Sequence, residues 1–286
     1  MPELPEIETV KLQLEKVLPG QTLKDVEIRS AKTVQGNIRS LVGKKVVSIK
    51  RMGKVLLINF GPNLDLGFHF KMTGQLVYEA HGKRIVGGHP TEDFWHQMPS
   101  SHTRAIFKFD NPPSREASEG RGGTLYFNDQ RLFGWIEINP GFVDKLGPEA
   151  LEITSDEFIK RLSKLRKPIK LAIMDQELIS GVGNIYANDA LWEAKINPRF
   201  PSGQLTVEQL TVLLDKIKLV LREGIKYGGA TAADAKYIDL HGLGGHYQEH
   251  FRVYDREGKP CHRGDGVVHK FELGGRGTYY CPKCQV

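Results

Sequence analysis

Residues 1–17 read MPELPEIETVKLQLEKV, and this stretch determines how the start of the chain is held. Its apolar residues recur at helical spacing, at Ile7, Val10, Leu14 and Val17. Pro5 and several carboxylates stand near the beginning, where the positive end of a helix dipole favours acidic groups and a proline loses no helical hydrogen bond. We therefore predict an amphipathic helix that anchors the N-terminus against a core, although chain ends usually fray.

The chain beyond this helix has the pattern of a β-sheet domain. From about residue 23 to residue 138, short β-branched and aromatic runs alternate with Gly, Pro and Asn, which is typical of an antiparallel sandwich. Examples of the expected strands are 46–50, 55–60, 105–109, 125–127 and 135–138. The stretches 79–104 and 110–123 are expected to be loops.

Beyond Gly147-Pro148 the periodicity becomes helical. Thr154-x-x-Glu157 and Thr206-x-x-Gln209 have the capping-box pattern that opens helices. The last stretch, 251–286, reads as a β-hairpin that carries the cysteines. The sequence thus predicts an α+β fold in three parts: an N-terminal β-sandwich with flanking helices (1–145), a helical domain (146–245) and a small C-terminal β-hairpin module (250–286).

Composition and charge narrow the function classes. The chain has 286 residues, a formal net charge of +6 and a pI of about 9.1, which favours an anionic partner without identifying one. No apolar run approaches the roughly 18–20 residues of a membrane span. The opening segment is acidic, the opposite of the basic-then-apolar order of a signal peptide, so we expect a cytoplasmic protein without membrane contact.

The cysteines point to a metal site or an ordinary thiol cluster. Only Cys261, Cys281 and Cys284 occur, and all lie near the C-terminus. A disulfide scaffold would spread an even number of cysteines through the chain, so such a scaffold is not expected.

Pro2 is the residue with the most distinctive chemistry. Once Met1 is removed, Pro2 presents a secondary amine, and its attack on a sugar C1′ gives an iminium directly. The pKa of an α-amino group is about 8, against about 10.4 for lysine, so much of it is free base near neutrality. Glu3 lies beside it as a proton donor or acceptor. The alternative is that a proline at position two only permits trimming of the initiator methionine.

The sequence PELPEIE at positions 2–8 resembles the opening of the formamidopyrimidine-DNA glycosylases, which remove 8-oxoguanine and ring-opened purines from DNA. The resemblance extends over nearly the whole chain. It implies that Pro2 is the Schiff-base nucleophile and Glu3 the general acid/base. Lys54, in Arg51-Met-Gly-Lys54, matches the family lysine that assists β-elimination; on position alone it is a turn lysine before a strand.

Two further stretches resemble the family loops that refill the duplex after a base is flipped out. Met72, in His69-Phe-Lys-Met72, matches the residue that fills the gap. In Asn128-Asp-Gln-Arg131-Leu-Phe133, the arginine would face the orphaned cytosine and the phenylalanine would intercalate. His69 would touch a phosphate, or else be a buried core histidine. Where the family often has Lys-His-x-His, this chain has Ser100-Ser101-His102, and His102 remains the DNA-contact candidate there.

The second half resembles the helix–two-turn–helix region of the family. Ile179-Ser-Gly-Val-Gly-Asn184 would expose backbone N–H groups to a phosphate, with Asn184 also capping a helix. The preceding basic window includes Arg166 and Lys170, and Lys170 is the expected phosphate contact near the lesion; the alternative is a solvated helix face. The run Gly228-Gly-Ala-Thr231 would cover the flipped base with main-chain amides, or is simply a helix C-cap and turn.

The C-terminal hairpin resembles the zinc finger of the family, with one departure. The family pattern is C-x2-C-x16-C-x2-C, and Gly264 stands where the second cysteine is expected. A structural Zn²⁺ would take its fourth ligand from His262, Asp265 or His269; a hairpin without zinc is the alternative. Arg276 matches the hairpin-tip arginine that reaches the DNA backbone and is linked with δ-elimination.

The resemblance implies a monomeric, bifunctional DNA glycosylase and AP lyase of base excision repair. It would excise 8-oxoguanine and formamidopyrimidines from double-stranded DNA through a Pro2 Schiff base, followed by β,δ-elimination. Two alternatives remain: an endonuclease VIII-like glycosylase for oxidised pyrimidines, and a DNA-damage binding protein without turnover. Leu4 argues against the first, because endonuclease VIII relatives usually have glycine there, and intact Pro2, Glu3 and Lys54 argue against the second.

Overall fold

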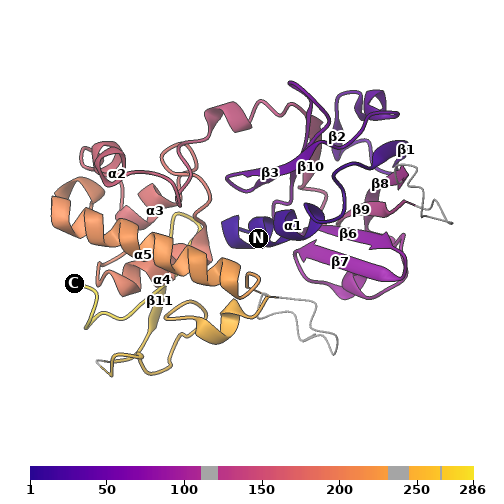
Figure 1. Ribbon diagram of the computed structural model, residues 1–286. Coiled ribbons are helices and arrows are strands. Elements are labelled where there is room, and N and C mark those ends of the chain that lie inside the picture. The colour runs from indigo at the N-terminus through magenta and orange to yellow at the C-terminus, as the bar shows by residue number, and fades with distance from the viewer. Residues whose placement is uncertain (111–121, 231–244, 265) are drawn as a thin grey trace. The chain divides into compact units, whose positions relative to one another are not determined.

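The computed structural model describes residues 1–110, 122–230, 245–264 and 266–286, drawn in colour in Figure 1. The chain forms two compact units. The first comprises Met1–Asp144 together with Gly228–Gly245, and the second comprises Lys145–Tyr227 together with His246–Val286. The described residues contain no helix that is both long and apolar enough to span a bilayer.

The first unit begins with the predicted helix, α1 (Leu4–Leu14). Its buried face consists of Leu4, Ile7, Val10 and Leu14, each at most 1% exposed. Val17 lies beyond the end of the helix and is partly buried against the same core. Figure 1 shows α1 lying beside β7 and β3, and it packs against both strands. The prediction of an anchored N-terminal helix is confirmed.

Two five-stranded sheets form the body of this unit. The first has the order β1 (Thr22–Ile28), β8 (Thr103–Asp110), β9 (Thr124–Asp129), β6 (Gly74–Ala80) and β7 (Lys83–Gly88). The second has the order β2 (Val34–Gln35), β10 (Trp135–Ile138), β5 (Asp65–His69), β4 (Val55–Asn59) and β3 (Ser48–Met52). Neighbouring strands pair antiparallel except β2 and β10, which are parallel. Short 3₁₀ turns occur at Ile38–Leu41, Glu92–Phe94 and Val143–Lys145.

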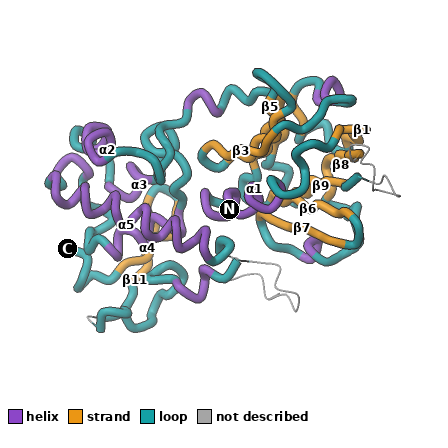
Figure 2. Tube along the Cα trace, in the orientation of Figure 1, coloured by secondary structure: helices purple, strands orange, loops and turns teal. Residues whose placement is uncertain are grey.

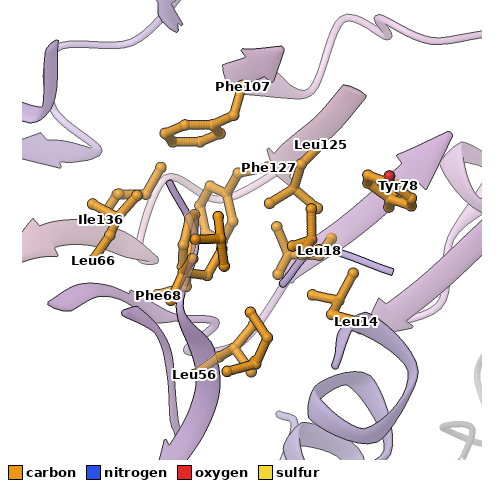
Figure 3. Packing of buried hydrophobic residues seen from close by; sticks show 14 of the residues in the cluster. Leu14, Leu18, Leu56, Leu66, Phe68, Tyr78, Phe107, Leu125, Phe127 and Ile136 are labelled. Atoms are coloured by element: carbon orange, nitrogen blue, oxygen red, sulfur yellow. The ribbon is translucent and has the colours of Figure 1, made fainter. Parts of the chain in front are cut away.

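The two sheets enclose one apolar core, shown in Figure 3, so the predicted sandwich is confirmed. Phe68 on β5 lies at its centre, fully buried, with its ring centroid 5.5 Å from that of Phe107 and 5.9 Å from that of Phe127. Phe107 and Phe127 belong to the other sheet, so these aromatic contacts join the two layers.

The expected loop over 79–104 is wrong in part, because Lys83–Gly88 forms strand β7. Only Val86 of this strand is buried, and its other residues are charged, glycine or half-exposed. β7 pairs with β6 alone at the edge of its sheet, and edge strands often carry charge and few apolar residues. Most of the other expected loop, 111–121, lies outside the described residues.

The second unit is helical with a terminal hairpin, as the tube in Figure 2 shows. Its helices are α2 (Ser155–Leu162), α3 (Ile169–Ile173), α4 (Asn184–Glu193) and α5 (Val207–Lys226), with 3₁₀ turns at Ser202–Gln204 and Tyr247–His250. Strands β11 (His269–Leu273) and β12 (Arg276–Tyr280) form the hairpin. α4 packs against α5 on one side and contacts β12 as well.

Both predicted helix starts are confirmed. The Thr154 hydroxyl accepts a hydrogen bond from the Glu157 N–H at 3.3 Å. At α5, Thr206 and Gln209 satisfy each other's backbone N–H groups, at 2.8 and 3.2 Å. The apolar face of α5 is buried, as expected for core.

Replacing Phe68 by Ala tests whether the sandwich core depends on this ring. The change leaves a cavity between the sheets, and we expect a loss of about 3–5 kcal/mol in the free energy of unfolding, measured by urea denaturation. Val47→Ala is the control, since Val47 is 59% exposed and should change stability by less than about 0.5 kcal/mol. Equal losses of stability in the two variants would show that the core does not depend on the Phe68 ring.

Candidate active site

The start of the chain is buried and held by its own helix. Pro2 is buried and Glu3 is 2% exposed. Glu3 is the N-cap of α1, and its backbone N–H donates to Glu6 Oε2 at 2.7 Å. Met1 precedes Pro2, so the Pro2 nitrogen is an amide in this structure and becomes a secondary amine only after Met1 is removed. The first turn of α1 thus fixes the two residues expected to act as nucleophile and acid/base.

Glu6 also holds a second segment of the first unit. Its other oxygen, Oε1, accepts the N–H of Ala230 at 2.7 Å. Gly229 has φ +89°, and a Cβ there would lie 2.8 Å from Glu6 Oε1, so only glycine fits. Gly228 has φ +75° just after the end of α5, which agrees with the C-cap interpretation. Thr231 lies outside the described residues.

Lys54 lies in the tight turn between β3 and β4. Gly53 before it has φ +55°, a left-handed conformation that glycine adopts readily. Lys54 is only 6% exposed, which is unusual for a lysine in a turn. Arg51 ties this turn to α1: it donates through Nη1 to the Gly53 carbonyl at 2.9 Å and through Nε to Glu8 Oε2 at 2.7 Å.

His69 ends β5, where its register partner is Val55, directly after Lys54. The Lys71 backbone N–H donates to its Nδ1 at 3.0 Å, so in the neutral ring the proton resides on Nε2. Burial, with the nearby charges of Lys71 and Lys54, lowers the pKa of His69 to about 3. The ring therefore stays neutral near pH 7 and offers an N–H donor rather than a positive charge.

The two predicted wedge loops are held together by Asp129, which is fully buried. One of its carboxylate oxygens accepts from the Thr73 hydroxyl and, at 3.2 Å, from the Arg131 N–H. The other accepts from the Gly134 N–H at 2.7 Å. Thr73 follows Met72, so a single carboxylate joins the Met72 loop to the loop of Arg131.

The wedge residues themselves are accessible. Met72 is partly exposed, and Phe133 is 52% exposed. The Arg131 guanidinium lies over the Phe133 ring, 4.7 Å from its centroid. Both side chains of this Arg131–Phe133 pair are therefore open to contact with another molecule.

His102 lies near these loops but in a different setting. Its Nδ1 is 2.9 Å from Oδ2 of Asp93, whose side chain is 6% exposed. Both residues line a cavity of about 640 Å³, together with His89, Ser101 and Gln130. The structure thus gives His102 an acidic partner that orients its ring.

In the second unit, three predicted residues gather at the start of β12. Lys170 is fully buried, and its Nζ donates to the Gly277 carbonyl at 3.0 Å and to the Thr278 hydroxyl at 2.7 Å. Asn184 does not cap α4, because Gly183 is the N-cap and Asn184 is the first helical residue; its side chain donates to the same carbonyl at 3.1 Å. Arg276 is exposed at the tip. Lys170 and Asn184 thus hold the hairpin close to its tip. Their phosphate contacts remain predictions, as does that of Arg166, which is exposed.

The three cysteines lie together, all buried, with their sulfur atoms within 4.8 Å of one another. Cys261 Sγ and Cys284 Sγ are 3.8 Å apart. A zinc–sulfur bond of about 2.3 Å in a tetrahedral site separates the sulfurs by roughly 3.8 Å, so the thiolates fit a structural zinc ion. Trp192 Nε1 donates to Cys261 Sγ at 3.3 Å, an orienting contact of the kind that metal ligands receive.

The fourth ligand stays a prediction. His262 Nε2 lies 3.3 Å from the Phe251 carbonyl oxygen, and the His269 ring lies beside Tyr280 on the exposed hairpin. Among the described residues, only the three cysteines form the cluster. Asp265 lies outside the described residues.

Several residues that contribute to this arrangement were missed by sequence reasoning. They are Glu6 as a double acceptor, Asp129 between the loops, and the Arg51–Glu8 pair. Glu6 had a local signal, since a carboxylate three residues after an N-cap is the capping-box spacing. The Arg51–Glu8 and Thr73–Asp129 contacts join residues 43 or more positions apart, for which a single sequence has no pattern.

Family models cover most of the chain. The N-terminal domain of formamidopyrimidine-DNA glycosylase matches residues 1–136, and its H2TH domain matches residues 146–236. The zinc finger found in FPG and IleRS matches residues 258–286, the part that holds the cysteine cluster.

Full-length relatives agree with these matches. The formamidopyrimidine-DNA glycosylase of Pelotomaculum thermopropionicum is 39% identical, over 100% of this chain and 99% of the relative. That of Ligilactobacillus salivarius is 35% identical over the same shares. The Thermus thermophilus MutM (Fpg) crystal structure superposes with a TM-score of 0.82 at 34% identity, covering 99% of this chain and 98% of that one.

A DNA complex is among the similar structures. The Lactococcus lactis Fpg bound to DNA containing an abasic site gives a TM-score of 0.81 at 31% identity, with 99% of each chain covered. The fold and the match over the whole length define a DNA glycosylase of base excision repair. This chain belongs to the formamidopyrimidine-DNA glycosylase family.

The neutral state of His69 makes a pH-dependent prediction. Because its pKa falls from the ordinary 6.5 to about 3 on folding, the unfolded chain binds an extra proton between these values, and stability decreases as the pH drops through this range. His69→Gln should make the decrease shallower, by up to about 1.4 kcal/mol per pH unit.

Urea denaturation at several pH values between 4 and 7 measures this slope. The control is His96→Gln, at an exposed position, which should keep the wild-type slope. Parallel curves for wild type and His69→Gln would show that His69 is not held neutral.

Zinc removal gives a separate prediction. Purified protein should contain one zinc per chain, and a chelator should lower the melting temperature and change Trp192 fluorescence, because this indole contacts Cys261. Cys281→Ser should lose most of the bound metal. Metal analysis that finds no zinc in protein purified without chelator would contradict the structural zinc site.

Proposed function

We propose that this protein excises 8-oxoguanine and formamidopyrimidines and cleaves the strand through a Schiff base at Pro2. One observation supports this most directly: the Pro2–Glu3 terminus is buried and held at the N-cap of α1 by the Glu3–Glu6 hydrogen bond. A chain end serves as a nucleophile only where it is positioned, since catalysis requires the reacting atoms at a defined geometry.

The chemistry follows from a free secondary amine. After Met1 is removed, the Pro2 nitrogen attacks C1′ of the damaged nucleoside, and the bond from C1′ to the base breaks as the base leaves with a proton. The Pro2 nitrogen loses its proton, O4′ gains one, and the C1′–O4′ bond breaks, which opens the sugar and leaves an iminium between Pro2 and C1′. The iminium makes the C2′ protons acidic, so loss of one of them expels the 3′-phosphate (β-elimination), and loss of the C4′ proton then expels the 5′-phosphate. Glu3 is the acid/base for these proton transfers.

Lys54 is proposed to assist the first elimination. Its buried position in the β3–β4 turn places a cationic group in the unit that holds Pro2, where it can lie close to a phosphate. His69, neutral and carrying a proton on Nε2, is proposed to donate to a phosphate oxygen. Structural zinc takes no part in these steps.

Flipping a nucleotide costs a few kcal/mol in lost stacking and pairing. We assign Met72 and Phe133 to filling the gap, and Arg131 to hydrogen bonds with the orphaned cytosine, because the Asp129 carboxylate joins their loops. His102, held by Asp93, is the further DNA contact proposed for this unit.

The second unit is proposed to bind the DNA backbone. Arg276 at the hairpin tip contacts phosphate and supports the second elimination, while Arg166, Lys170 and Asn184 complete the contact. Loop residues through Thr231 are proposed to cover the flipped base.

The zinc site would hold Cys261, Cys281 and Cys284 with His262 or His269 as fourth ligand. The domain limits 1–145, 146–245 and 250–286 also stand as a proposal.

Solved structures of relatives support the substrate class. The Lactococcus lactis Fpg has been crystallised with DNA containing an abasic site and, as a variant, with DNA containing Fapy-dG. We infer that this protein acts as a monomer on damaged chromosomal DNA in the bacterial cytoplasm.

Borohydride trapping tests the proposal. With an 8-oxoguanine:C duplex, wild-type protein should give a covalent adduct whose peptide maps to Pro2, because the reagent reduces the iminium to a stable amine. A variant that retains Met1 should give none, since its Pro2 nitrogen is an amide. Absence of an adduct with wild type would point to a binding protein without turnover. Faster excision from thymine-glycol:A than from 8-oxoguanine:C would favour an endonuclease VIII-like enzyme.

A further inference from the structure

Arg51 occupies an unusual place for a charged residue near a turn. Its side chain is 8% exposed, and that of Glu8 is 18% exposed. The guanidinium donates through Nε to Glu8 Oε2 at 2.7 Å and through Nη1 to the Gly53 carbonyl at 2.9 Å. Charge-assisted hydrogen bonds of this length, away from water, are stronger than those of an exposed ion pair.

These two bonds connect the two parts of the proposed catalytic apparatus. Glu8 belongs to α1, the helix capped by Glu3. Gly53 directly precedes Lys54 and has φ +55°. The carbonyl that Arg51 binds belongs to the peptide between Gly53 and Lys54, so this bond holds the backbone at Lys54. One planar side chain therefore spans from the helix of the nucleophile to the turn of the lysine.

We propose that Arg51, held by Glu8, is a positioning residue for strand cleavage: it sets the location of Lys54 relative to the Pro2–Glu3 terminus. This inference rests on the proposed function. It predicts that loss of the link slows elimination, while DNA binding and overall folding are largely kept, because misplacement of a catalytic group by about 1 Å can cost about 100-fold in rate.

Arginine and lysine differ at such a position. A guanidinium can donate in two directions at once from a fixed plane, whereas an ammonium on a flexible stem is a point charge. Arg51→Lys keeps the charge and should lose the simultaneous bonds to Glu8 and Gly53. Glu8→Gln keeps an acceptor but removes the ionic attraction, so its effect should be smaller.

Single-turnover kinetics on a duplex with a preformed abasic site tests the proposal, since this substrate needs elimination but no base release. We expect strand cleavage to slow about 10- to 100-fold in Arg51→Lys and less in Glu8→Gln, with duplex affinity within about twofold of wild type. Asp25→Asn is the matched control, because its ion pair with Lys108 lies on the same unit and is about half exposed.

A double-mutant cycle separates positioning from a merely structural role. If Arg51 acts through Lys54, then Arg51→Lys should slow cleavage little further in a Lys54→Gln background, because residues that act as a unit are non-additive. Fully additive losses, or unchanged cleavage in Arg51→Lys, would overturn the proposal. Should Arg51→Lys not fold in a thermal melt, the Glu8→Gln cycle with Lys54→Gln decides in the same way.

The outcome is distinguishable from failure of the proposed function. Wild-type protein that neither cleaves an abasic duplex nor forms a borohydride adduct refutes the Pro2 mechanism itself. Wild-type protein that does both, with Arg51 variants cleaving at the same rate, refutes only the role of Arg51.

Discussion

The arrangement of the segments around Pro2 depends on the carboxylate of Glu6. One oxygen accepts the N–H of Glu3 and the other accepts the N–H of Ala230, each at 2.7 Å. The same helix, through Glu8 and Arg51, reaches the turn of Lys54. The acidic residues of α1 therefore do more than favour the helix dipole: they hold two segments that are distant in sequence, at Ala230 and at the Lys54 turn, against the start of the chain. The apolar face of α1, buried in the sandwich, keeps these acceptors in place.

The fold was predictable where a local pattern repeats. Helical spacing identified α1, and capping boxes identified the starts of α2 and α5. Short β-branched and aromatic runs identified β3, β4, β8, β9 and β10. β7 was missed, because an edge strand buries little and its composition resembles that of a loop.

The candidate site was predictable only as residue identities. Pro2, Glu3 and Lys54 were found from chemistry and family resemblance, but their supports were not. Lys170 illustrates the limit: within a basic window it resembled a surface residue, yet it is fully buried against Gly277 and Thr278. No periodicity distinguishes a buried lysine that meets a hairpin from an exposed one, since the difference lies in residues about a hundred positions away.

The carboxylate of Asp129 has a mechanical consequence for the wedge loops. Because it accepts from Thr73 on one loop and from Arg131 and Gly134 on the other, the backbones of the Met72 and Phe133 loops are coupled through one side chain. In the wedge role proposed for them, loops joined in this way would lose little conformational entropy on entering a stacked duplex. The distortion then falls on the DNA, so sites whose stacking is already weakened yield more readily than intact ones, before any contact with the damaged base is made.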